Sequence, residues 1–123
     1  MNVKKQVDYW LKSARGDFET AEVLFENAKF HHSLLFCHLT LEKGLKAIVV
    51  IHTKEIPPRS HNLLYLAELA GLSVDPDDED FLLRMNGYQL EARYPDEKFR
   101  IYKKTTKAVT QDLLSKTKGI RIA

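Results

Sequence analysis

The chain has 123 residues, of which 44% are hydrophobic, and its formal net charge is +2. This length and apolar content suit a single domain, residues 1–123, with one core that is large enough to fold without disulfides. The small net charge argues neither for nor against a polyanionic partner such as nucleic acid. No segment offers about 20 uninterrupted apolar residues, so the sequence predicts no membrane span and no membrane partner.

The single cysteine, Cys37, lies in a strongly apolar run. One cysteine cannot form an intramolecular bridge, and the first residues lack the basic and apolar arrangement of an export signal. Together these features predict a cytoplasmic protein. The commonest role of such a cysteine is that of a small core residue.

Two long helices are predicted in the first half of the chain. Between residues 4 and 28, apolar side chains recur at steps of three and four with charged residues between them, which is typical of an amphipathic helix. Residues 30–52 form a more apolar helix, which we expect to lie at the centre of the fold. Because only a short turn separates the two, they should pack antiparallel as a hairpin.

Three shorter helices are predicted after a loop that a proline pair at positions 57 and 58 imposes. The third helix follows with Ser60 as its N-cap and ends near Gly71, where a left-handed cap is easiest. Asp75 and Pro76 begin a fourth helix that runs to about residue 91. A fifth is expected from about residue 99 or 101 to 118. The sequence therefore predicts an all-α, up-and-down bundle of about five helices.

Three groups of polar residues interrupt the apolar pattern of this bundle. They comprise His38, Glu42, Lys43 and Lys46 on the central helix, His61 and Asn62 after the proline loop, and Arg93, Tyr94 and Asp96 after the fourth helix. Residues four apart share one face of a helix, so His38, Glu42 and Lys46 form a line. A buried carboxylate needs a partner, and we expect Arg93 or Tyr94 to supply it for Glu42. A register-setting structural role for Glu42 is the alternative.

These three groups resemble the motifs of the HEPN domain family, the higher eukaryotes and prokaryotes nucleotide-binding domain. Their order and spacing match over nearly the whole chain. The resemblance implies a helical bundle similar to the substrate-binding domain appended to some nucleotidyltransferases. It also implies a homodimer, a minimal nucleotidyltransferase as partner, and a pairing of the toxin-antitoxin kind.

On this resemblance we expect a non-catalytic binding and interaction module that takes a nucleotide or RNA as its candidate ligand. Arg93, Lys43 and Lys46 would hold a phosphate, and Tyr94 would stack on a base. His61 and Asp96, like Glu42, would then be structural polar residues.

The alternative is a metal-independent HEPN ribonuclease, an RNA-cleaving toxin. Such enzymes in the wider superfamily use an arginine followed four to six residues later by a histidine. The last histidine here is His61, so none follows Arg93, and an arginine alone stabilises charge without moving a proton. The ribonuclease reading therefore needs a degenerate site in which His38 or His61 serves with Arg93. No metal is predicted, because His31 and His38 are separated by about 10 Å of helical rise. No cofactor is predicted either, and the sequence has no Gly-rich phosphate loop with its lysine.

Overall fold

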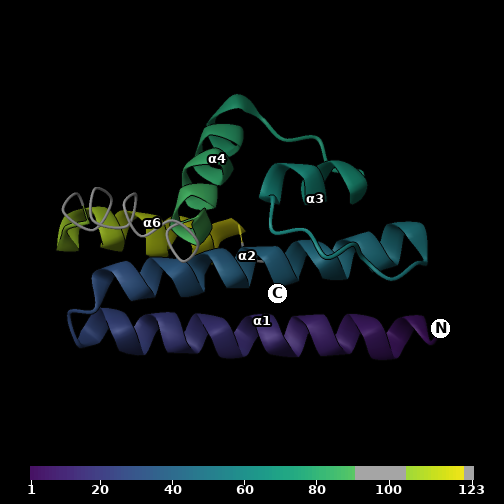
Figure 1. Cartoon of the computed structure of the whole chain (residues 1–123), viewed down its shortest axis with the longest axis horizontal. Coiled ribbons are helices and arrows are strands. Elements are labelled where there is room, and N and C mark those ends of the chain that lie inside the picture. Colours follow the sequence, from purple (N-terminus) through teal and green to yellow (C-terminus); the bar gives the residue numbers. More distant parts are fainter. Residues whose placement is uncertain (91–104, 121–123) are drawn as a thin grey trace.

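The computed structural model describes residues 1–90 and 105–120, and these residues form five α-helices without a strand. The helices are α1 (Val3–Glu26), α2 (Phe30–Thr53), α3 (Leu63–Leu69), α4 (Pro76–Leu90) and α6 (Lys107–Ile120) (Figure 1). The predicted all-α bundle is confirmed. None of the described helices is long and apolar enough to cross a membrane.

The first two helices form the predicted antiparallel hairpin (Figure 1). Helix α1 ends at Glu26, two residues earlier than its apolar pattern indicates, because Ala28 adopts a left-handed conformation with φ 59°. The Lys29 amide then donates to the Leu24 carbonyl at 2.8 Å and closes the turn. Within the hairpin, the buried hydroxyl of Ser33 donates to the carbonyl of Ala21 at 2.7 Å.

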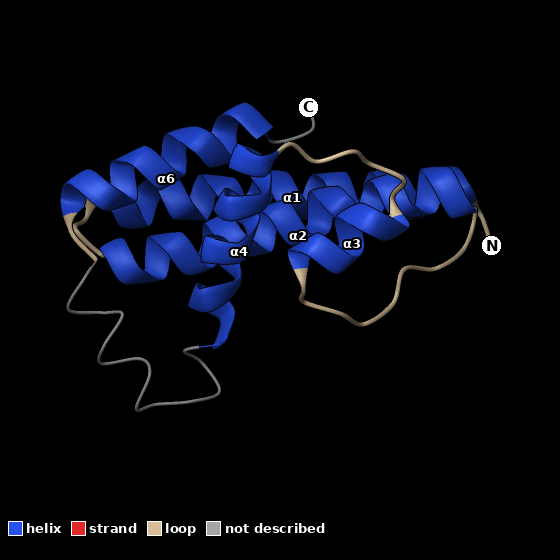
Figure 2. Ribbon diagram, turned by 90° about the horizontal axis from the view of Figure 1, so that it is seen from above, coloured by secondary structure: helices blue, strands red, loops and turns tan. Residues whose placement is uncertain are grey.

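Helix α2 is the centre of the fold, as its apolar composition predicts. It contacts α1, α3, α4 and α6, which lie around it (Figures 1 and 2). Its apolar side meets the inward faces of the other helices in one core, which includes Ala21, Leu34, Cys37, Leu41, Leu45, Leu63, Leu66, Phe81, Met85 and Leu113. Burial of these side chains is the main stabilising contribution to the fold.

The ends of α3 and α4 follow local signals in the sequence. Gly71 has φ 73° after the end of α3, as predicted for a left-handed cap. The Asp75 carboxylate accepts from the Asp78 amide at 2.8 Å, so it caps the start of α4. The predicted N-cap of α3 is wrong: Asn62, not Ser60, accepts from the Leu64 amide at 3.1 Å.

The last described helix begins later than predicted. A helix running from residue 99 or 101 would include residues 105 and 106, but these are not helical and α6 begins at Lys107. The hydroxyl of Thr106 accepts from the Val109 amide at 3.2 Å, so Thr106 serves as the N-cap. A threonine favours this capping geometry over a place within the helix. Residues 99–104 lie outside the described part of the chain.

Candidate functional site

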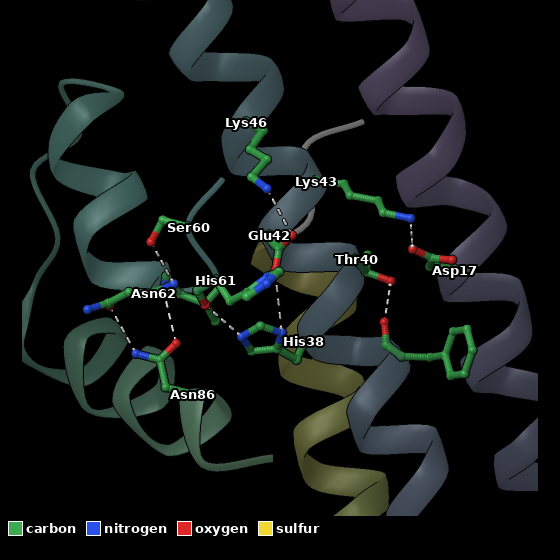
Figure 3. A network of polar contacts seen from close by, with 12 residues as sticks. Asp17, His38, Thr40, Glu42, Lys43, Lys46, Ser60, His61, Asn62 and Asn86 are labelled. Carbon is green, nitrogen blue, oxygen red and sulfur yellow. Dashed lines mark hydrogen bonds and ion pairs between the residues drawn. The ribbon is translucent and has the colours of Figure 1, made fainter. Parts of the chain in front are cut away.

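The polar line on α2 is buried in the folded chain. His38 is fully buried, and Glu42 and Lys46 are only 4% and 6% exposed. Because they are four residues apart, all three lie along one side of the helix, where His38 and Glu42 point toward His61 and Lys46 points toward Glu42 (Figure 3). A carboxylate and an ammonium at this depth are costly unless each has a partner. The contacts around Glu42 therefore decide what this cluster can do.

Both oxygens of the Glu42 carboxylate accept hydrogen bonds. Lys46 Nζ donates to Oε2 at 3.0 Å, and His61 Nδ1 donates to Oε1 at 2.8 Å (Figure 3). The Lys46 ammonium also lies 5.2 Å from the centre of the Trp10 ring on α1, within cation–π distance. One carboxylate thus joins α2, the loop before α3 and, through Lys46, the first helix.

His38 holds the backbone of that loop. Its Nε2 lies 3.0 Å from the His61 carbonyl oxygen, which can only accept, so Nε2 carries the proton. The other ring nitrogen, Nδ1, lies 3.9 Å from Glu42 Oε1, too far for a hydrogen bond. Burial lowers the pKa of His38, although the Glu42 carboxylate opposes the shift. The ring is therefore neutral at pH 7 and positions the backbone of His61.

Two asparagines extend the network to α4. The side-chain oxygen of Asn86 accepts from the Leu63 amide at 3.0 Å, while its nitrogen donates to the Asn62 oxygen at 3.1 Å (Figure 3). The Ser60 hydroxyl accepts from the Asn62 amide at 3.1 Å. These bonds fix the first turn of α3 against α4 and so hold His61 next to Glu42.

Lys43 points to a different partner. Its Nζ lies 2.7 Å from an oxygen of Asp17 on α1, and both side chains are partly buried (Figure 3). This pair bridges the hairpin on the side away from His61. Of the two lysines predicted to hold a phosphate, each already has an acidic partner within the chain.

The structure brings together four of the predicted site residues, His38, Glu42, Lys46 and His61 (Figure 3). Lys43 pairs with Asp17 instead. Arg93, Tyr94 and Asp96 lie outside the described residues, and so does the predicted pairing of Glu42 with the segment at 93–94. Lys46 and His61 are the partners that Glu42 has in the described part of the chain.

The sequence analysis missed three residues of this network: Trp10, Asp17 and Asn86. Trp10 and Asp17 meet Lys46 and Lys43 only because the hairpin packs α1 against α2, and no local pattern indicates this. Asn86 could have been identified from the sequence. It is a polar residue beside Met85 on a helix whose apolar side faces the core, and such a residue often caps or bridges a neighbouring element.

His61 is the most accessible residue around the Glu42 carboxylate. Its side chain is 41% exposed, whereas His38, Glu42 and Lys46 are buried. With Nδ1 directed to the carboxylate, Nε2 is the ring nitrogen left for other partners. No three histidine, cysteine, aspartate or glutamate residues of the described part come together in a way that could hold a metal ion.

Comparison with known proteins agrees with this fold. The family model described as HEPN domain matches residues 7–122, nearly the whole chain. No curated protein and no solved structure matches it. The matched region includes all five described helices apart from the first residues of α1, together with the whole polar cluster around Glu42. The chain therefore belongs to the HEPN domain family.

Proposed function

We propose that this HEPN domain is a non-catalytic binding and interaction module. In this proposal it is a cytoplasmic homodimer that acts with a minimal nucleotidyltransferase partner in a system of the toxin-antitoxin kind, and it holds a nucleotide near Arg93. The observation that carries the choice is the internal pairing of the Glu42 carboxylate. Its two oxygens accept from Lys46 and His61, so this carboxylate is satisfied within the chain.

Cleavage of RNA requires a proton carrier beside a site that binds the phosphate. Within the described residues, both lysines of the predicted phosphate site are paired with carboxylates, Lys46 with Glu42 and Lys43 with Asp17. His38 is fully buried and donates to a backbone carbonyl. This arrangement favours a structural role for the cluster over a catalytic one.

Nucleotide binding in this proposal rests mainly on Arg93 and Tyr94. A guanidinium can hold a phosphate through two parallel hydrogen bonds, and a tyrosine ring can stack on a base. Because Lys43 and Lys46 are ion-paired in the free protein, they would have to exchange a carboxylate for the phosphate. We therefore expect the two lysines to contribute less affinity than Arg93.

A metal-independent ribonuclease is the second candidate, and one observation favours it. A carboxylate that accepts from Nδ1 of a partly exposed histidine is the arrangement that orients a general acid or base in many enzymes. In this alternative His61 Nε2 transfers the proton, Glu42 orients the ring, His38 positions the His61 backbone and Arg93 stabilises charge on the phosphate.

Thermal unfolding with and without millimolar ATP, GTP or a short single-stranded RNA tests the nucleotide site. A ligand at about 100 times its Kd stabilises by about 2.7 kcal/mol, which raises Tm by about ten degrees for a domain of this size. Arg93→Ala should abolish the shift. Arg84→Ala removes an exposed arginine from α4 and is the matched control, which should retain it.

Incubation with single-stranded RNA in the presence of EDTA separates the two candidates. We expect no cleavage at high protein concentration. Cleavage that is lost in both His61→Gln and Arg93→Ala, but kept in Arg84→Ala, would overturn the non-catalytic proposal in favour of the ribonuclease. Because His61 and Arg84 are both partly or fully exposed, the two substitutions should leave the fold intact.

A further inference from the structure

We propose that the outer face of α1 is a self-complementary surface on which a second copy of this chain binds antiparallel, with Gly16 at the twofold axis. The inference rests on the homodimer of the proposed function and names its surface. Helix α1 lies at the edge of the bundle, with α2 along its inner side (Figure 1). Its buried residues are Ala14, Phe18 and Ala21, so its opposite side faces outward.

The outward side carries two rows of exposed residues with a spacing of seven. One row consists of Tyr9, Gly16 and Val23, and the neighbouring row consists of Lys5, Lys12, Glu19 and Glu26. Seven residues are close to two full turns, so each row follows one line along the helix. This is the spacing with which one helix meets another along its length.

The apolar residues are placed symmetrically about Gly16. Tyr9 and Val23 are 60% and 56% exposed, and each lies about 10 Å from Gly16 along the helix axis. An antiparallel copy centred on Gly16 places its Val23 against Tyr9, and the reverse contact follows from the symmetry. Two exposed large side chains in each chain are thereby covered.

The charged residues on the outer face of α1 also favour an antiparallel second copy. The row is basic in its first half, at Lys5 and Lys12, and acidic in its second half, at Glu19 and Glu26. An antiparallel copy brings Lys12 to Glu19 and Lys5 to Glu26, whereas a parallel copy would oppose like charges. Within residues 1–90 and 105–120, none of these four side chains forms an ion pair.

Gly16 has no packing role within the described chain. A Cβ built at Gly16 would meet nothing within 4 Å, so an alanine would fit there. Glycine is less favourable than alanine inside a helix, and a glycine retained there often marks the close approach of another backbone. At the centre of the proposed interface it allows the two α1 helices to approach closely.

Charge reversal with light scattering tests the surface. Lys12→Glu places like charges at two symmetry-related contacts, and we expect the dimer Kd to rise by about tenfold or more. The double variant Lys12→Glu with Glu19→Lys restores opposite charges and should return the Kd to within a few-fold of the original. Lys107→Glu makes the same change of charge on α6 and is the matched control.

Crosslinking with a short bis-maleimide tests the orientation. Lys5→Cys should crosslink to Glu26→Cys in a mixture of the two variants but not to itself, because the two Lys5 positions are about 30 Å apart in this arrangement. The natural Cys37 is buried and gives little background. The expected product is therefore the mixed pair.

The two measurements distinguish a failure of the proposed α1 surface from a failure of the homodimer proposal. A monomer at all micromolar concentrations would overturn both. If the dimer Kd is unchanged in Lys12→Glu, or if Lys5→Cys crosslinks to itself, the α1 surface is overturned. The homodimer of the proposed function then still stands. Rescue by the double variant together with the mixed crosslink would establish the surface.

Discussion

Replacing Glu42 by glutamine should destabilise the fold by about 3 kcal/mol, because it leaves the buried Lys46 ammonium without its counter-charge. The two side chains are 5% and 7% exposed, and their charged atoms are 3.0 Å apart. At that separation an effective dielectric constant of about 20 gives an attraction of roughly 5 kcal/mol. The glutamine oxygen, which can still accept from Lys46, lowers the expected loss to about 3 kcal/mol, while the cation–π contact of Lys46 with the Trp10 ring is present in both proteins and cancels.

The loss of the hydrogen bond between His61 and Glu42 adds little to this loss of stability. Glutamine keeps one oxygen that can accept from Lys46, but its amide nitrogen cannot accept from His61. His61 is 41% exposed, so its ring can turn to water instead. Urea unfolding measures the difference, and a loss of about 3 kcal/mol lowers the midpoint by about 2 M at an m-value of about 1.5 kcal/mol/M.

A double variant and a surface pair provide the controls. Glu42→Gln with Lys46→Met removes both charges, so it should be more stable than Glu42→Gln alone. Asp112 and Lys116 have the same spacing on α6, 3.3 Å apart but more than half exposed, and Asp112→Asn should cost under about 0.5 kcal/mol. A loss below about 1 kcal/mol in Glu42→Gln, or simple additivity in the double variant, would refute the reasoning.

Three further outcomes follow from single side chains. Burial lowers the pKa of His38 below its ordinary value of 6.5, so the folded chain binds fewer protons than the unfolded chain and stability falls as pH drops below about 6.5. His38→Gln should flatten that fall in urea titrations at pH 5 and 7, and an undiminished slope would count against it. Burial raises the pKa of the Cys37 thiol to about 12, so a disulfide reagent should modify it at pH 8 only as fast as the chain unfolds. Immediate reaction of the native protein would contradict this. Ala28→Gly should raise stability by about 1 kcal/mol, because Ala28 has φ 59°, and Tm should rise by about four degrees in calorimetry. An unchanged or lower Tm would show that the left-handed turn is not strained.

Most of the helical fold could be predicted because its signals are local. The apolar periodicity placed α1, α2 and α4 within one or two residues at each end, and Gly71 and Asp75 marked two boundaries correctly. The helix starts that were predicted wrongly, those of α3 and α6, depend on side chains that can either cap a helix or take another position. Thr106 fits a helical pattern but caps α6 instead.

The start of α3 shows why such choices need the tertiary structure. Ser60 and Asn62 are both good N-caps, and nothing in the local sequence separates them. In the fold, the Asn62 side chain also accepts from Asn86, which is 24 residues further along the chain. That contact holds the Asn62 oxygen where the free amides of α3 can reach it. The start of α3 is thus decided by α4.

The polar line on α2 could be predicted from spacing alone, but its partners could not. His38, Glu42 and Lys46 share a face in any helix, and the need for a partner at Glu42 follows from burial. The identity of that partner depends on how the proline loop returns to α2. The loop brings His61, 19 residues away, within 2.8 Å of Glu42.

We expect the carboxylate of Glu42 to give the bundle a specificity that its apolar core does not supply. Leucine and alanine side chains would tolerate small shifts of α3 along α2, because apolar contact has no preferred direction. A buried carboxylate is different: it requires donors at fixed positions, and Lys46 and His61 satisfy both of its oxygens only in the observed arrangement. His38 fixes the backbone of His61 at the same time. We therefore expect the cluster to help set where the loop and α3 lie on α2.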